Sequence, residues 1–232
     1  MEQLTFELST PEPPSFANFL PGPNGEVVTA LRRLAAGEIA ETGVLIWGAH
    51  GAGRTHLLRA TVAAASALCD TRFHAQPAHA SAEPARPQML IAIDDVQAAD
   101  SDTQGRLFTL FNRLRETRGH MLVAADTPPG RLPLRDDLRT RLGWGLVYEV
   151  RPLADADKPA ALARYAKERG LPLAADVIAY LLAHGRRDMT TLVATLAALD
   201  RHSLATKRPI TIPLLRAWLQ QDLALRPLDR DV

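Results

Sequence analysis

The stretch VLIWGAHGAGRT, residues 44–55, decides the fold of this chain. Val44–Trp47 is a short apolar run, which is typical of a strand buried on both faces. After the loop, the residues from His56 to Leu68 are rich in alanine and favour a helix. Between strand and helix, the glycines of Gly48–Thr55 allow backbone N–H groups to surround phosphate oxygens, and the N-terminus of the helix favours negative charge. The stretch therefore predicts a strand, a phosphate-binding loop and a helix.

The loop departs from the usual pattern at Arg54, where a lysine is expected. Lysine occurs only at positions 158, 167 and 207, so a cationic contact to phosphate in the first half of the chain must come from arginine. A guanidinium keeps the charge but is planar and bulkier, so phosphate contact is retained in a changed geometry. Thr55 is placed to offer its hydroxyl to Mg²⁺. Taken alone, the loop is equally consistent with a glycine-rich turn that has no ligand.

A second apolar run, Met89–Ile93, ends in the acidic pair Asp94 and Asp95. This pattern matches the strand of a P-loop NTPase in which Asp94 holds Mg²⁺ through water. Asp95 then polarises the attacking water. Two surface acids at the end of a strand are common in isolation, but a phosphate loop and an acid-tipped strand in this order are not. Together they predict a P-loop NTPase.

The remaining pattern predicts an α/β domain followed by helices. Apolar runs at 44–47, 89–93, 121–125 and 146–150 predict buried strands, and residues 72–74 are a possible short strand, which together indicate a parallel five-stranded sheet. The apolar spacing at 27–34 and 107–114 indicates helices. Residues 76–87, rich in proline and alanine, are not expected to form a helix. Segments 156–169, 175–184, 188–202 and 212–224 predict a small helical bundle. We expect a terminal peptide and linker at 1–15, an α/β nucleotide-binding domain at 16–151 and a helical lid domain at 152–232.

Composition excludes several classes of protein. The 232 residues carry 27 basic and 26 acidic side chains, and this balance argues against binding nucleic acid mainly through bulk charge. Cys69 is the only cysteine, so neither an internal disulfide nor a cysteine-cluster zinc site can form. No apolar run is long enough to span a bilayer, and the first residues do not read as a secretory signal. We expect a cytoplasmic protein.

Four motifs give the chain a specific resemblance. They are GAGRTHLL at 51–58, IDDVQ at 93–97, ADTPP at 125–129 and RTRLGWG at 139–145. In this order they resemble the AAA+ core of the DnaA family of bacterial replication initiators, from about Phe16 to about Leu223. Within that family the chain is most similar to the Hda group, the regulatory inactivators of DnaA. Three features suggest this group: Arg54 in the loop, no helix-turn-helix DNA-binding domain after the lid, and the start QLTFEL at 3–8.

The resemblance implies roles for individual residues. Asp126 matches the sensor-1 position beside the γ-phosphate, and Arg141 matches the arginine finger that this family presents to a neighbouring nucleotide. Thr190 stands where the lid of the family carries its sensor-2 arginine. With Asp95, the expected catalytic residues are Arg141 and Asp126; Thr55 and Asp94 are the expected metal ligands. The residues expected to bind nucleotide are Gly48, Gly51, Ala52, Gly53, Arg54, Thr55, His56, Asp94, Phe19 and Leu20.

The resemblance also implies partners. We expect a negative regulator of chromosomal replication initiation that stimulates hydrolysis of DnaA-bound ATP through an arginine finger supplied in trans. It would bind the sliding clamp of the replicative polymerase through Gln3, Leu4, Phe6 and Leu8, although this alternation could equally form an edge strand. The expected cofactors are ADP or ATP with Mg²⁺, with weak or no intrinsic ATPase activity. We expect no membrane association and no sequence-specific DNA binding. We expect association with the nucleoid and replisome, and a homo-oligomer is possible. The alternative is a self-contained AAA+ ATPase of the helicase-loader type, which the intact Asp94 and Asp95 favour.

Overall fold

The structure is a computed structural model that describes residues 13–80, 86–171, 173–185, 188–206 and 209–225. Contacts divide the described chain into two compact units, with the division after Leu153. The first unit contains the sheet and the second contains only helices. Each is described below by itself.

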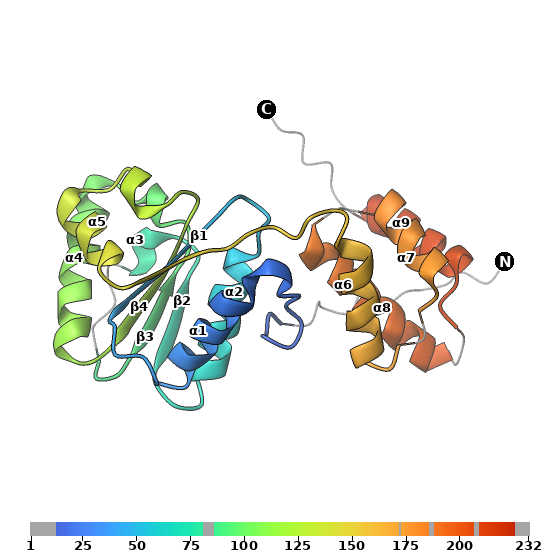
Figure 1. The fold of residues 1–232 in the computed structure, drawn as a ribbon, viewed down its shortest axis with the longest axis horizontal. Coiled ribbons are helices and arrows are strands. Elements are labelled where there is room, and N and C mark those ends of the chain that lie inside the picture. Colours follow the sequence, from blue (N-terminus) through green and yellow to red (C-terminus); the bar gives the residue numbers. More distant parts are fainter. Residues whose placement is uncertain (1–12, 81–85, 172, 186–187, 207–208, 226–232) are drawn as a thin grey trace. The chain divides into compact units, whose positions relative to one another are not determined.

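The first unit is built on a parallel sheet with the strand order β2-β3-β4-β1-β5 (Figure 1). Its strands are β1 (Gly43–Trp47), β2 (Thr71–His74), β3 (Leu90–Ile93), β4 (His120–Ala125) and β5 (Leu146–Glu149). The register pairs Ile46 with Ala124 across β1 and β4, and Ile93 with Val123 across β3 and β4. The three central strands are almost entirely buried, so they read in the sequence as continuous apolar runs.

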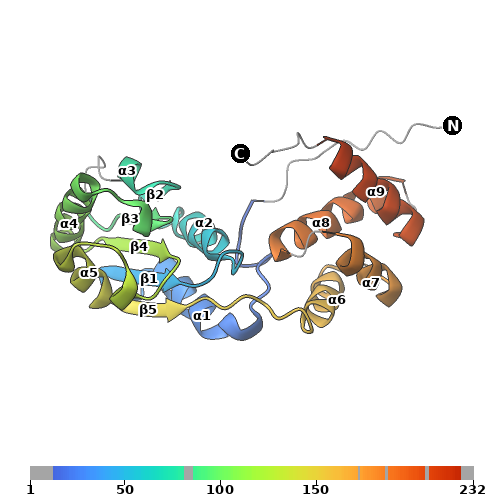
Figure 2. The ribbon, with the colours of Figure 1, turned by 90° about the horizontal axis from the view of Figure 1, so that it is seen from above.

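Helices cover both faces of this sheet (Figure 2). On one face α1 (Gly25–Ala35) and α2 (Arg54–Ala65) pack on side chains such as Val44 and Leu122. On the other face α4 (Ser101–Glu116) and α5 (Asp136–Gly143), with Ala80 of the short α3 (Pro77–Ala80), pack on side chains such as Leu45 and Val123. Neighbouring residues of a strand point to opposite faces, so each central strand contributes to both cores. The result is a three-layer α/β/α arrangement.

The second unit is a bundle of helices. They are α6 (Lys158–Glu168), α7 (Ala175–His184), α8 (Met189–Thr206) and α9 (Ile212–Leu225). Helix α7 contacts α6 and α9, and α6 also contacts α8. Its core consists of buried side chains that include Leu162, Tyr165, Leu181, Leu196, Leu199 and Leu215. Within the described ranges of both units, no helix combines the length and the apolar character that a membrane span requires.

The fold agrees with the predicted α/β architecture and helical lid, but local predictions were wrong at three places. Residues 77–80 form one helical turn, where no helix was expected. Residues 136–143 form helix α5, for which the apolar spacing predicted no helix. Strand β5 was expected to be buried, yet its residues are only half-buried because it lies at the edge of the sheet.

Candidate functional site

The residues expected to bind phosphate gather at one edge of the sheet. The loop at 48–53 follows β1, Asp94 and Asp95 follow β3, and Asp126 follows β4. These strands are parallel and adjacent, so their carboxyl ends meet at the same edge, where ligands bind in open α/β sheets. The Gly48 N–H donates to the Ala125 carbonyl (3.2 Å), which sets Asp126, itself exposed, beside the start of the loop.

Two glycines are required by the path of the loop. A Cβ atom at Gly48 would lie 2.1 Å from the Val150 carbonyl oxygen, so a larger residue would push β5 away from β1. Gly53 precedes α2 with φ +98°, which side chains disfavour, and a Cβ there would lie 2.8 Å from the Phe19 ring. Gly51 also has a positive φ (78°). Between them Ala52 is buried in the core under α1 and α2. This backbone turns the N-terminus of α2 toward the carboxyl edge of the sheet.

Thr55 and Asp94 meet directly. The Thr55 hydroxyl donates to Asp94 Oδ2 at 2.5 Å, and Asp94 is buried (5% exposed). Two hard oxygen donors at one point suit Mg²⁺, which takes few protein ligands and keeps several waters. The pair therefore fits the metal, which would supply charge neutralisation for nucleotide phosphates when bound. Among the described residues there is no cluster of three or more His, Cys, Asp or Glu side chains that could hold another metal ion.

Arg54 lies beneath the loop and is nearly buried. Its side chain is 10% exposed, its Nη2 atom is 3.7 Å from Asp95 Oδ1, and its buried Nη1 atom has no hydrogen-bond partner in the described ranges. Asp95 Oδ1 also accepts from Gln97 Nε2 (3.1 Å), and Asp95 has left-handed backbone with φ 45°. A buried cationic donor without a partner is costly. The arrangement fits an anionic ligand that completes the hydrogen bonding of the guanidinium.

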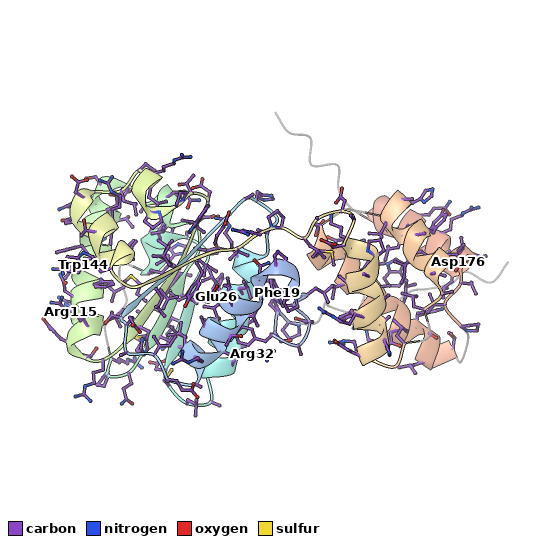
Figure 3. The ribbon with its side chains drawn as sticks, viewed as in Figure 1. Phe19, Glu26, Arg32, Arg115, Trp144 and Asp176 are labelled. Carbon is purple, nitrogen blue, oxygen red and sulfur yellow. The ribbon has the colours of Figure 1, made fainter. Side chains whose placement is uncertain are left out.

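The segment before α1 contacts the start of α2. His56 Nε2 lies 2.9 Å from the Ser15 carbonyl oxygen, and the Phe19 ring is 5.4 Å from the His56 ring (Figure 3 labels Phe19). Burial lowers the pKa of His56 and outweighs the hydrogen bond to Ser15, which acts in the opposite direction. Leu20 follows in a half-buried position. The Phe19 ring thus borders the phosphate loop, where it was expected to contact adenine.

Arg141 is far from this group. Its carbonyl oxygen lies 3.6 Å from a Cβ atom built on Gly43, the first residue of β1, whereas the loop follows the last residue of that strand. Five strand residues span about 16 Å, so Arg141 starts from the opposite end of β1 from the phosphate loop. Within the described ranges it has no acidic partner, in contrast to Arg139, which pairs with Asp136. The Arg141 guanidinium instead lies over the Trp144 ring, 4.6 Å from its centroid.

Some expected site residues lie outside the described residues. These are Gln3, Leu4, Phe6 and Leu8, and also the side chain of Thr190.

Other contacts at the site had no clear signal in the sequence. Buried Asn24 donates to the Arg151 carbonyl (2.8 Å) and accepts from the Arg151 N–H (2.8 Å), which fixes the lead-in to α1 against the chain that leaves β5. The only hint was the turn-forming run PGPNG at 21–25.

Comparison with known proteins extends this picture. Residues 78–149 match the bacterial DnaA ATPase domain, and residues 155–219 match the Hda lid domain. Domain III of Thermotoga maritima DnaA is 19% identical, with 94% of this chain and 100% of that chain covered and a TM-score of 0.66. AMPPCP-bound DnaA from Aquifex aeolicus is 21% identical (84% and 70% covered, TM-score 0.63), and a point mutant of T. maritima RuvB is 15% identical (92% and 74%, TM-score 0.61).

At these identities the likeness to solved structures shows the fold, which is that of an AAA+ protein. The two family matches are more specific, because one falls in each unit and the second is particular to the lid of the Hda group. With its five-stranded parallel sheet and its helical lid, the chain belongs to the DnaA/Hda family of AAA+ proteins.

Proposed function

We propose that this DnaA-related regulator turns off the replication initiator DnaA by stimulating hydrolysis of the ATP bound to DnaA. In this proposal Arg141 enters the nucleotide site of DnaA in trans. A guanidinium spreads its charge over a rigid fork of donors, which suits the charge that develops on phosphate oxygens during transfer. In GTPase systems a finger supplied by an activating protein raises the rate by about 10³–10⁵.

The position of Arg141 carries the proposal. A finger that served its own nucleotide would have to start near its own phosphate loop, whereas Arg141 is at the opposite end of β1. It is half-buried, and none of the acidic side chains in the described ranges pairs with it. Its charge is therefore available to a phosphate on another molecule. Arg139, two residues away, has its charge engaged by Asp136.

The phosphate loop of this chain is proposed to bind adenine nucleotide with Mg²⁺ and to hydrolyse it poorly. The solved relative from A. aeolicus holds AMPPCP, a nucleotide with three phosphates. Here the backbone of the loop, Arg54 and the Thr55–Asp94 pair supply contacts to the β-phosphate and the metal. Asp95, the residue expected to polarise water, has its Oδ1 atom near Arg54 and bonded to Gln97. Because these donors already engage Oδ1, this atom is not free to accept a hydrogen bond from an attacking water, and binding of ADP is favoured over turnover of ATP.

The sliding clamp is the second proposed partner, through Gln3, Leu4, Phe6 and Leu8. Small peptide contacts concentrate their energy in a few anchors. Gln3 would supply hydrogen bonds and the apolar side chains would supply burial. Docking on a clamp that encircles DNA would bring the regulator to replicated DNA without a sequence-specific DNA contact of its own.

A self-contained ATPase is the second candidate, and Thr55, Asp94 and Asp95 favour it because they retain the oxygen atoms that such an enzyme needs. One assay separates the two functions. ATP-loaded DnaA is incubated with clamp loaded on DNA, with and without this protein, and conversion of the DnaA-bound ATP to ADP is followed. The proposal expects conversion to accelerate only when all components are present. Rapid hydrolysis of free ATP by this chain alone, with no acceleration on DnaA, would instead identify a self-contained ATPase.

A further inference from the structure

Trp144 is a large apolar side chain that the fold leaves in solvent. It is 67% exposed, at the end of helix α5 (Figure 3). The backbone at this point is fixed: the Trp144 N–H donates to the Thr140 carbonyl (3.0 Å), and a Cβ atom at the next residue, Gly145, would lie 1.9 Å from the Gly43 carbonyl oxygen. The indole ring therefore projects from a rigid support while it contributes little buried area to its own domain.

The neighbour of this ring is Arg141. The Arg141 guanidinium carbon lies 4.6 Å from the Trp144 ring centroid and 5.7 Å from that of Phe108 on α4. Both distances are within the range of cation–π attraction, and tryptophan gives the strongest such contact. Arg141 and Trp144 are three residues apart at the end of one helix, which is the spacing at which side chains meet.

We propose that Trp144 is a positioning residue that holds the Arg141 side chain in the stacked conformation from which it enters the nucleotide site of DnaA. The inference rests on the proposed function of Arg141. A free arginine side chain samples many rotamers, and a stacked one has fewer to lose when it binds phosphate. Trp144 acts through Arg141 and does not itself reach the reacting atoms.

The contact predicts a specific kinetic effect. Cation–π attraction changes an equilibrium by about two- to fivefold at an exposed site, and by about thirtyfold when the pair is desolvated. The stacked conformation matters after the two proteins have met. Its loss should therefore lower the maximal stimulated rate and leave the half-saturating concentration of this protein unchanged.

The test compares Trp144→Phe with Trp144→Leu in the full chain. The stimulated hydrolysis of DnaA-bound ATP is measured over a range of concentrations of this protein. Phenylalanine keeps an aromatic face and should retain most of the maximal rate, whereas leucine keeps only the apolar contact and should lose about two- to thirtyfold. Leu68→Ala is the control, because Leu68 is equally exposed (69%) and belongs to a different segment, beyond the end of α2. It should behave as the unaltered protein does.

Several results would overturn the inference. A raised half-saturating concentration with an unchanged maximal rate would make Trp144 a docking contact only, and equal losses in the two variants would show that the aromatic face is irrelevant. Nuclear magnetic relaxation of the Arg141 Nε–H group, measured in the isolated protein, provides a readout that does not need DnaA. The group should be more mobile in Trp144→Leu than in Trp144→Phe, and equal mobility would refute the stacking role. Full stimulation by Arg141→Ala would refute the proposed function instead, and the relaxation result would still decide the role of Trp144.

Discussion

Replacement of Arg54 by methionine should stabilise the nucleotide-free protein and weaken its binding of ADP. Arg54 is nearly buried, its contact with Asp95 is long (3.7 Å), and its Nη1 atom has no hydrogen-bond partner among the residues that the structure describes. A buried guanidinium with an unpaired N–H group destabilises the fold. Its presence is explained if a nucleotide phosphate accepts that hydrogen bond when it binds. Methionine is flexible and unbranched, so it can fill the space of the arginine stem without burying a charge.

The magnitudes follow from the two contacts of the guanidinium. Removal of an unsatisfied buried donor gains about 1–3 kcal/mol. Loss of an ion pair whose Asp95 partner is half-exposed costs about 0.2–1 kcal/mol. The free energy of unfolding should therefore rise by about 0–3 kcal/mol. Loss of one hydrogen bond to a charged phosphate costs about 1.5–3 kcal/mol, which weakens ADP binding by about 10- to 150-fold.

Urea denaturation without nucleotide and isothermal titration with ADP measure these two effects separately. Arg59→Met is the matched control: it removes the same charge from the same helix, but Arg59 is exposed and lies over the Phe73 ring (4.1 Å) instead of under the loop. It should leave ADP affinity unchanged. If Arg54→Met unfolded more easily by over about 1 kcal/mol and still bound ADP normally, Arg54 would be a structural residue and the reasoning would fail.

Three further predictions concern other parts of the first unit and the N-terminal segment. Burial lowers the pKa of His56, so the stability that depends on its neutral form is present above about pH 6.5 and is lost as the pH falls below that value. His56→Gln should therefore flatten the pH dependence of thermal unfolding, and an unchanged slope would show that this dependence does not come from His56. Gly145→Ala should lower the free energy of unfolding by about 1–3 kcal/mol because its Cβ atom meets the backbone of Gly43, whereas Gly130→Ala, with open space around it, should be neutral; equal urea midpoints would contradict this. Deletion of residues 1–8 should abolish binding to immobilised clamp and leave the melting temperature unchanged, and undiminished clamp binding would eliminate the peptide.

The sequence predicted the elements whose burial leaves a regular apolar pattern along the chain. Strands β1, β3 and β4 are buried on both faces, so each appears as an unbroken apolar run. Helix α5 was missed because it has only two buried apolar residues, Leu138 and Leu142, among arginines and aspartates. That pattern also fits an exposed connection.

Contacts between distant segments could not be predicted in the same way. Thr55 and Asp94, which hydrogen-bond to each other, were expected to lie close together because both were assigned to the same metal ion. By contrast, the two hydrogen bonds between Asn24 and Arg151 join residues 127 positions apart, and the stacking of Arg141 on Trp144 depends on a helix end that the pattern did not reveal. Polar contacts of this kind have no period in the sequence, so only the folded chain reveals them.

The central claim is that Arg141 supplies the catalytic charge to DnaA, and one comparison of variants tests it most directly. ATP-loaded DnaA, clamp loaded on DNA and either Arg141→Ala or Arg139→Ala are mixed, and the rate of ADP formation on DnaA is measured. The account predicts that Arg139→Ala retains most of the stimulation, because that side chain is engaged by Asp136, while Arg141→Ala folds, binds the clamp and loses stimulation by about 10³-fold or more, down to the unstimulated rate. Full stimulation by Arg141→Ala would show that another group triggers hydrolysis.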